Sequence, residues 1–179
     1  MSTRQIRTIF FRIVAILLLL SLVAIGIFSY KTLNSLGNQI VYFVKSEDNH
    51  FSLQAVVRNS ESKTLKDKLV DAMEFLIAGP KENEKNQGLA TNFFKDTKLL
   101  SLKIIADEVS VDFSNEFLHP QGISALEGLI NQVFYTLSQA NSINKVRVLV
   151  DGSPLNYIGG EGIIVDQPWI KTSDNLPKW

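Results

Sequence analysis

The longest apolar run of the chain lies near its N-terminus. Residues 13–30 read IVAILLLLSLVAIGIFSY and contain no charged side chain. A helix that crosses the hydrocarbon core of a membrane, roughly 30 Å thick, needs about 20 such residues, and residues 9–11 extend the run toward that length. No face of the run is polar, which argues against a helix on the surface of a globular domain. The pattern therefore predicts a transmembrane anchor at residues 13–30.

The charges around this run predict its orientation. Lys31 stands directly after it, and three arginines precede it: Arg4, Arg7 and Arg12. Positive charge gathers on the cytoplasmic side of a membrane helix. We therefore expect a cytoplasmic N-terminus at residues 1–12, and a single-pass protein whose remaining chain lies outside the cytoplasmic membrane.

A cleavable signal peptide is the competing interpretation of the same run. Ala24 and Gly26 are small enough to form a cleavage site, but the apolar run continues past them. It also exceeds the roughly 7–15 residues typical of a signal peptide. The length favours an uncleaved anchor.

Beyond the anchor, apolar residues recur with the periods of strands and helices. Residues 31–38 form a short polar stem, residues 39–170 carry the periodic patterns, and residues 171–179 form a tail. Alternation and β-branched residues predict strands at 39–45, 51–58, 98–105, 109–113 and 145–150. Leu100, Leu102 and Ile104 are expected on one face of the third strand. Apolar stripes predict helices at 64–78 and 122–139, and the charged run 81–87 is expected to be a solvated loop.

This order of elements predicts the fold class. The sequence β-β-α-β-β-α-β, with two amphipathic helices, is typical of an α+β domain. We expect a two-layer sandwich with both helices on one face of a mostly antiparallel sheet.

Charge and cysteine content exclude several functions. The chain has eighteen cations and eighteen acids, but residues 31–179 carry fifteen cations against all eighteen acids, a net charge of −3. A nucleic-acid-binding domain would show a clustered basic face instead. The absence of cysteine excludes disulfides, thiolate metal sites, a thiol nucleophile and a lipid anchor on an N-terminal cysteine.

The residues that carry most enzyme chemistry are sparse. His50 and His119 are the two histidines, and neither stands in a metal-ligand spacing such as HExxH. No catalytic base is paired with a nucleophile, and no cofactor motif is present. We therefore expect neither enzymatic activity nor a metal or cofactor.

Asp112, Ser114 and Glu116 form the best acidic cluster. Alternation along a strand would place all three on one side, which suits a hard cation or a pair of catalytic carboxylates. In the alternative interpretation, Asp112 faces out of a half-buried strand while Ser114 and Asn115 organise the following turn. We favour the second interpretation, because no further oxygen ligands are spaced nearby.

Two glycine-containing segments are candidate interaction sites. Asp151 and Gly152 form a turn pair after the last predicted strand. Further on, three glycines stand within four residues: Gly159, Gly160, Glu161 and Gly162. This stretch lacks the spacing of a dinucleotide-binding motif and a phosphate-loop lysine. It predicts a turn whose surface another protein can contact.

Six motifs in order resemble the GerMN domain, a bacterial family named for sporulation and spore germination. The first helix ends in a Leu-x-Ala-Gly-Pro pattern at residues 76–80, and residues 109–117 are similar to the family's V-x-V-D-[LF]-S-x-E-F. The other motifs lie at 88–89, 97–102, 132–139 and 146–152 with 159–162. Phe93 and Phe94 stand where the family commonly has Ile-Pro, and Asp96 stands where it commonly has Gly. The domain occurs once here.

The resemblance implies a non-catalytic envelope protein, with a fold similar to ring-building modules of secretion systems. We expect protein–protein interaction or assembly outside the cytoplasmic membrane, with envelope proteins as partners and self-association as a further option. The alternative is a domain that binds the cell wall or a small ligand near Gly159–Gly162. A wall hydrolase that uses Asp112 and Glu116 is a third, weaker hypothesis.

Overall fold

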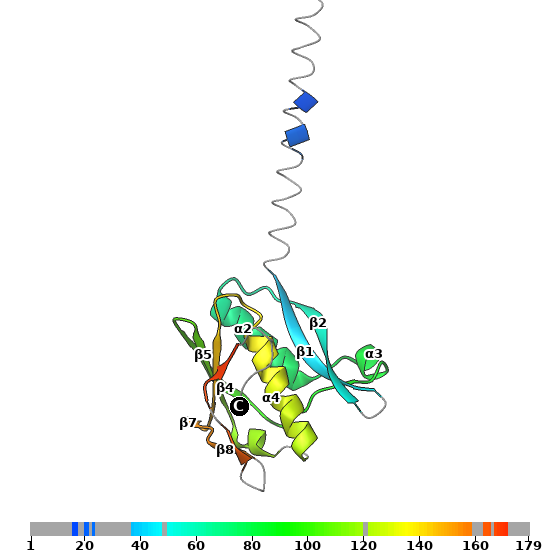
Figure 1. The fold of residues 1–179 in the computed structure, drawn as a ribbon. Coiled ribbons are helices and arrows are strands. Elements are labelled where there is room, and N and C mark those ends of the chain that lie inside the picture. Colours follow the sequence, from blue (N-terminus) through cyan, green and yellow to red (C-terminus); the bar gives the residue numbers. More distant parts are fainter. Residues whose placement is uncertain are drawn as a thin grey trace, which may run out of the picture. The chain divides into compact units, whose positions relative to one another are not determined.

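The structure, a computed structural model, divides the chain into two units, Met1–Asn38 and Gln39–Trp179. It describes residues 16–17, 20–21, 23, 37–47, 50–119, 122–158, 163–165 and 167–171. The second unit carries the folded domain, coloured from cyan to red in Figure 1.

Most of the expected anchor at residues 13–30 lies outside the described residues, as do residues 31–36 of the stem and 172–179 of the tail. In the part of the chain that the structure describes, no helix is long and apolar enough to cross a membrane. The anchor, the stem, the tail and their boundaries stay predictions.

The first two strands form the expected hairpin and belong to a three-stranded sheet. β1 (Asn38–Glu47) and β2 (His50–Asn59) are followed, beyond the first helical region, by the short β3 (Leu89–Ala90). The order in the sheet is β2-β1-β3. β3 pairs with β1 antiparallel, with Val44 opposite Ala90. β2 is therefore an edge strand.

The remaining long strands form a second sheet in the order β10-β6-β5-β4. β4 (Leu99–Ile105) and β5 (Glu108–Phe113) are antiparallel, whereas β5 and β6 (Lys145–Val150) are parallel. Two short strands join β6, β7 (Ser153–Pro154) and β10 (Trp169–Ile170). β8 (Tyr157–Ile158) and β9 (Ile163–Ile164) pair with each other.

The expected α+β class is confirmed, but the expectation of one sheet with both helices on one face is wrong. Figure 1 shows α2 (Leu65–Ala78) and α4 (Ile123–Leu137) between the β1–β2 hairpin and the β4-β5-β6 strands. The reason lies in α4, which connects β5 to β6 and returns the chain in the same direction. A crossover helix of this kind makes its two strands parallel, so β6 joins β5 and not the hairpin.

The first helix has the expected boundaries. The Thr64 side chain accepts a hydrogen bond from the Asp67 backbone N–H, at 3.1 Å, as an N-cap does. The helix ends at Gly79, whose φ of 83° is a left-handed conformation that favours glycine. Four side chains of the predicted stripe are buried: Leu69, Ala72, Met73 and Leu76.

The charged run 81–87 is exposed apart from Glu84, as its composition predicts, but it is not a loop throughout. It contains a short helix, α3 (Glu82–Lys85), and the side chain of Glu84 forms an ion pair with Arg58 of β2. The two side chains are only 13% and 7% exposed. The sequence does not predict this ion pair, because the partner of Glu84 lies far back in the chain, where a local charge pattern carries no information about it.

The predicted face of β4 is also partly wrong. Leu99 pairs with Phe113 and Ser101 pairs with Asp112, so Leu100 has no opposite residue. This bulge shifts the alternation of the strand. As a result Leu102 is buried and Ile104 half-buried, while Leu100 is 49% exposed.

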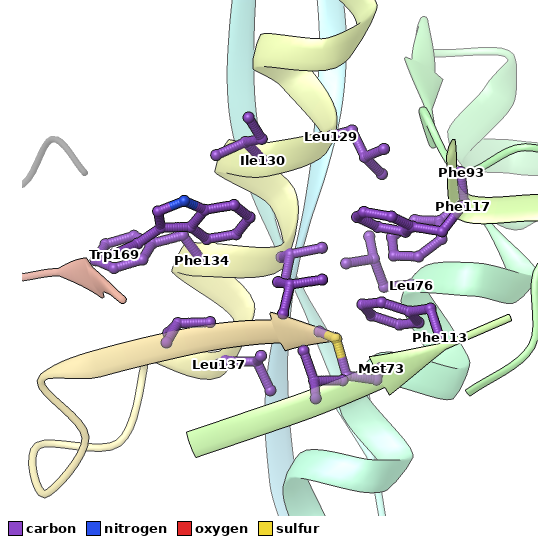
Figure 2. Close-up of a cluster of buried hydrophobic side chains, with 14 of the residues drawn as sticks. Met73, Leu76, Phe93, Phe113, Phe117, Leu129, Ile130, Phe134, Leu137 and Trp169 are labelled. Atoms are coloured by element: carbon purple, nitrogen blue, oxygen red, sulfur yellow. The ribbon is translucent and has the colours of Figure 1, made fainter. Parts of the chain in front are cut away.

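The core fills the space between the two sheets and the helices. Figure 2 shows Met73 and Leu76 of α2 facing Phe113 and Phe117, with Phe134 of α4 beside Trp169. Trp169 and Phe134 are 35 residues apart in the chain, yet both pack in the core and each is at most 1% exposed. The two-residue strand β10 therefore anchors the C-terminal part of the domain by one large buried side chain.

Candidate functional site

The candidate site lies at the carboxyl ends of the parallel strands β5 and β6. These strands pair from Glu108 opposite Lys145 to Phe113 opposite Val150. In sheets with parallel strands and crossover helices, ligands bind outside the carboxyl ends. The segments that follow the two strands surround a hollow of about 370 Å³. Its lining combines the buried Val150 and Leu155 with four exposed polar residues: Asn115, Asp151, Ser153 and Asn156.

Asp112 holds the turn beside this hollow. Its Oδ1 accepts a hydrogen bond from the Gly152 backbone N–H at 3.0 Å. The backbone N–H of Asp151 donates to the Phe113 carbonyl at 2.9 Å, and Asp151 adopts a positive φ of 47°. The two bonds tie the Asp151–Gly152 turn to the end of β5. Asp112 therefore has a structural partner and faces out of a half-buried strand, as the favoured interpretation expects.

Ser114 joins the start of β4 to the end of β5. Its Oγ accepts a hydrogen bond from the Lys98 backbone N–H at 2.9 Å, and its own N–H donates to the Lys98 carbonyl at 3.0 Å. The hydroxyl is left to donate to Glu116. Ser114 thus organises the turn into the 3-10 helix η1 (Asn115–Leu118).

Glu116 lies on η1 and not on the strand. The hydrogen bond from Ser114 lowers the pKa of the Glu116 carboxyl below its usual value, helped by the backbone N–H of Glu116 and the charges of Lys98 and His119. A carboxyl that protonates a leaving group near neutral pH needs a raised pKa. The lowered pKa favours the ionised carboxylate, the opposite of the shift that a general acid needs.

The structure separates the three members of the acidic cluster. Asp112 bonds to the β6–β7 turn, whereas Ser114 and Glu116 bond to each other and to the β4 side. Among the described residues, no group of three or more histidine, aspartate or glutamate side chains is placed to hold a metal ion. The cluster is thus divided between two structural roles.

The strands on either side of the glycine-rich segment are described, but the segment itself is not. Gly159, Gly160, Glu161 and Gly162 lie outside the described residues, between β8 and β9. On the two flanking strands, Tyr157 pairs with Ile164, and the two side chains are 63% and 70% exposed. Tyr157 also lines the hollow.

This exposed apolar pair is a site feature that the sequence analysis missed. Apolar residues on both sides of a glycine-rich turn, as in YIGGEGII, are the signal of a hairpin. The signal is weak because each strand has only two residues.

The apolar residues of the 109–117 motif all serve the core. Val109, Val111 and Phe113 are fully buried, and Phe117 is 1% exposed. The rings of Phe113 and Phe117 stack at a centroid distance of 4.7 Å, with an interplanar angle of 5°. The alternation of the motif therefore encodes a buried strand followed by an aromatic stack.

Comparison with known protein families gives a match over most of the folded domain. Residues 40–156 match the Germane family, described as sporulation and spore germination. The chain belongs to this family. The resemblance to the GerMN domain is thereby confirmed. A search of curated proteins finds no match.

Solved structures of the Germane fold include two from one protein. The tandem GerMN domains of the sporulation protein GerM from Bacillus subtilis match at 24% identity with a TM-score of 0.60. The match covers 73% of this chain and 44% of the tandem structure, so the chain spans less than half of that relative. The first GerMN domain of GerM alone matches at 20% identity and a TM-score of 0.59, over 75% of this chain and 97% of that domain.

A third structure, of a Clostridium perfringens protein described as a lipoprotein, is also similar to this chain. The identity is 24% and the TM-score 0.54, over 75% of this chain and 87% of that one. At these identities the likenesses establish the fold.

One departure from the family pattern is explained by the backbone conformation of the residue involved. Asp96, which stands where the family commonly has glycine, adopts a φ of 68°. Aspartate tolerates the left-handed conformation better than most residues with a side chain. The loop before β4 therefore makes its turn without a glycine.

Proposed function

We propose that this Germane-family chain is a membrane-anchored extracytoplasmic module, which acts without catalysis by contacting other proteins of the bacterial cell envelope. One observation carries the proposal. Asp112 and Ser114 are the motif residues best suited to chemistry. Their side chains instead accept hydrogen bonds from the backbone N–H groups of Gly152 and Lys98 and hold the fold together. Membership of a family whose domains are not known as enzymes agrees with this reading.

The proposed location rests on the sequence alone. The uncharged run 13–30, with three arginines before it, favours an anchor whose N-terminus is in the cytoplasm. A part in sporulation or germination follows from the family description only. The proposal is therefore one of contact and assembly in the envelope, with the partners unidentified.

Chemical crosslinking in intact cells tests the proposal. The full chain with an affinity tag is purified from crosslinked membranes, and co-purified proteins are identified by mass spectrometry. We expect envelope proteins to be enriched over a control strain that carries an unrelated single-pass protein. Repeated recovery of this chain alone would count against a contact function.

A second candidate function is the binding of cell wall or a small ligand in the hollow at the carboxyl ends of β5 and β6. The mixed apolar and polar lining of this 370 Å³ hollow, beside the exposed Tyr157, favours it. The test is sedimentation of the detergent-solubilised chain with purified sacculi. If the hollow is the site, Tyr157→Ala weakens the association, whereas Phe51→Ala, at an equally exposed ring far from it in sequence, leaves it unchanged.

The hydrolase hypothesis has a direct test of its own. Release of dye from labelled sacculi is measured with the full chain and with Asp112→Ala. We expect no release by either protein. Release that disappears in the variant would revive a catalytic role for Asp112.

A further inference from the structure

A hollow of about 290 Å³ lies where the C-terminal end of α4 meets the first half of β1, and we call it the α4 hollow. Its walls come from three parts of the chain that are far apart in sequence. Ile40 and Tyr42 belong to β1, Phe134 and Tyr135 belong to the last turns of α4, and Lys171 directly follows β10. The α4 hollow shares no lining residue with the hollow at the carboxyl ends of β5 and β6.

Hydrogen bonds between side chains and backbone fix two walls of the α4 hollow to each other. The Gln139 side chain accepts from the Ile40 backbone N–H and donates to the Ile40 carbonyl, each at 2.9 Å. The Thr136 hydroxyl oxygen accepts from the Tyr42 backbone N–H at 3.1 Å. The spacing between β1 and α4 is therefore set by the fold, as in the preformed sites that small ligands use.

Aromatic rings form one side of the α4 hollow. The ring centroids of Tyr42 and Tyr135 are 5.6 Å apart with an interplanar angle of 46°. Phe134 meets Tyr135 edge to face, at 5.5 Å and 84°. Both tyrosines are half-buried, so part of each ring is open to the hollow. These rings suit an occupant with an apolar or aromatic group, because aromatic side chains pack well against both.

Hydroxyl groups on the same walls are available as hydrogen-bond donors. Ser138 lines the α4 hollow and is only 3% exposed, yet its hydroxyl has no hydrogen-bond partner among the described residues. The hydroxyls of Tyr42 and Tyr135 have no partner in that part of the chain either. Burial, helped by the neighbouring Tyr42, raises the pKa of Tyr135, which keeps its hydroxyl protonated. Because a buried polar group without a partner is costly, these hydroxyls favour an occupant that accepts hydrogen bonds.

Lys171 is the only charged residue among the described residues that line the α4 hollow. Its ammonium donates to the Ser138 carbonyl at 3.1 Å, and within the described part of the chain its other two N–H groups have no acceptor. The carbonyl end of a helix carries about half a negative charge, which is less than the unit charge of the ammonium. A net positive charge therefore remains beside the hydroxyl donors. A carboxylate accepts hydrogen bonds from both kinds of group and neutralises this charge.

We propose that the α4 hollow binds a carboxylate that is attached to one apolar or aromatic side chain. The carboxylate contacts Lys171 and the hydroxyls of Ser138 and Tyr135, while the side chain packs against the tyrosine rings. A C-terminal residue of a partner protein and a free small acid share this chemistry, and the volume suits one such group. The inference goes beyond the proposed contact function and does not depend on where in the cell the chain lies.

Amide chemical shifts provide the test. The full chain, labelled with ¹⁵N in detergent micelles, is titrated with N-acetylphenylalanine. We expect saturable shifts at 40–42, 134–139 and 171, with a dissociation constant in the millimolar range that suits a ligand of this size. N-acetylphenylalanine amide keeps the ring but lacks the charge, and N-acetylglycine keeps the charge but lacks the ring. Both are expected to bind at least tenfold more weakly. The amide also controls for partition into detergent.

A fourth probe distinguishes the two sources of the carboxylate. It is an acetylated five-residue peptide of glycine and serine that ends in phenylalanine with a free carboxylate. An affinity equal to or above that of N-acetylphenylalanine assigns the ligand to the C-terminus of a partner chain. A lower affinity assigns it to a free small acid.

Variants of the lining residues make the test site-specific. Lys171→Gln removes the charge but keeps an N–H donor, and it is expected to weaken binding of N-acetylphenylalanine about tenfold. Ser138→Ala and Tyr135→Phe each remove one hydroxyl and are expected to weaken binding about threefold. Lys103→Gln, at an exposed lysine of β4, is the matched control and leaves binding unchanged. Dispersed amide signals verify that each variant is folded.

Three kinds of result would overturn the inference. Equal binding of the amide, or shifts that map to the hollow at the carboxyl ends of β5 and β6, would exclude a carboxylate site at the end of α4. Unchanged binding by a folded Lys171→Gln variant would exclude the ammonium as the donor. If the wild type shows no saturable shifts with any of the four probes, the site is wrong. The proposed contact function would still stand, because crosslinking tests it separately.

Discussion

Arg58 and Glu84 show how a residue's role depends on a partner that is remote in the chain. The guanidinium donates two hydrogen bonds to the carboxylate, one of 2.8 Å from Nη1 to Oε1, and its carbon lies 5.4 Å from the centroid of the Phe43 ring. Glu84 also accepts from the Lys81 backbone N–H at 2.8 Å. The pair thus fastens the α3 segment to the first sheet.

Glu84→Gln is expected to lower the free energy of unfolding by about 3 kcal/mol, because it leaves the buried Arg58 without its counter-charge. Urea denaturation of the full chain in detergent measures the change. Glu82→Gln is the matched control on the same helix. Glu82 is 81% exposed and its contact with Lys85 contributes little, so a loss as large as that of Glu84→Gln would contradict the assignment.

The same pair predicts a pH dependence. The hydrogen bond from Arg58 lowers the pKa of Glu84 in the folded state, against the opposing effect of burial. A lowered folded-state pKa contributes stability that is present above the unfolded-state pKa, about 4.3, and is lost as the pH falls through the folded value. The difference in unfolding free energy between wild type and Glu84→Gln is therefore expected to shrink below about pH 4.3. A difference that is constant with pH would exclude this linkage.

At the scale of elements, α4 has two buried stripes where the sequence predicts one. The apolar stripe faces the core, but Gln132 and Thr136, both 0% exposed, lie beside β1 with Gln139. The Ile40 and Tyr42 backbone N–H groups donate to Gln139 and Thr136, and the Gln132 amide donates to the Tyr42 carbonyl. These side chains bind the part of the β1 edge that β3 does not reach. A hydropathy pattern treats them as the polar face of an amphipathic helix.

Gln132→Leu is expected to destabilise the domain by about 3 kcal/mol, because it removes the hydrogen-bond partner of three part-buried backbone groups. Gln132 accepts from the Asn92 N–H at 2.8 Å and donates to the carbonyls of Tyr42 and Ala90. Hydrogen exchange of the Asn92 amide is expected to accelerate. Glu127→Gln, at an exposed position of the same helix, is the control and changes neither quantity. Unaltered exchange at Asn92 would show that another group satisfies this amide.

Gly128 on α4 permits a close approach to the loop before β4. A Cβ at this position would collide with the Asn92 amide nitrogen and lie 3.1 Å from Val44 Cγ1. Asn92 has little freedom to withdraw, since its amide donates to the Ala125 carbonyl at 2.9 Å. Position 128 therefore requires glycine, although glycine lowers the helix propensity of α4.

Gly128→Ala is accordingly expected to lower the melting temperature, although alanine gains about 1 kcal/mol of helix propensity over glycine. Overpacking of a well-packed site costs about 1–3 kcal/mol. Ser124→Ala, exposed in the first turn of α4, tests propensity without the collision and is expected to be neutral or stabilising. A stabilised Gly128→Ala variant would show that the Asn92 side chain moves away and makes room for the added methyl group.

At the scale of the whole molecule, the division into an N-terminal unit and a folded domain follows from composition, and the arrangement of the sheets does not. Five of the domain's strands and its two long helices have sequence patterns that place them to within a few residues. The pairing of β6 with β5, and the placing of the helices between two sheets, depend on contacts between distant segments. The candidate site arises from this pairing, because it lies where the two parallel strands end.

The anchor makes a prediction for the whole chain. Membranes extracted with alkaline carbonate are expected to retain the protein at its full mass of 20.1 kDa, and protease added to spheroplasts is expected to digest the domain. The three N-terminal arginines are the reason for expecting this orientation. A shortened product released into the soluble fraction would instead indicate a cleaved signal peptide.

The sequence by itself determined the α+β class, the family, most strand and helix boundaries, and the structural reading of Asp112 and Ser114. These properties depend on local periodicity, caps and turns, which act over a few residues. Only the tertiary structure decided the two sheets, the burial of Glu84 and the role of Gln132. Each of these depends on which distant groups meet, and the free energy of a buried polar group is set by the partner that it finds.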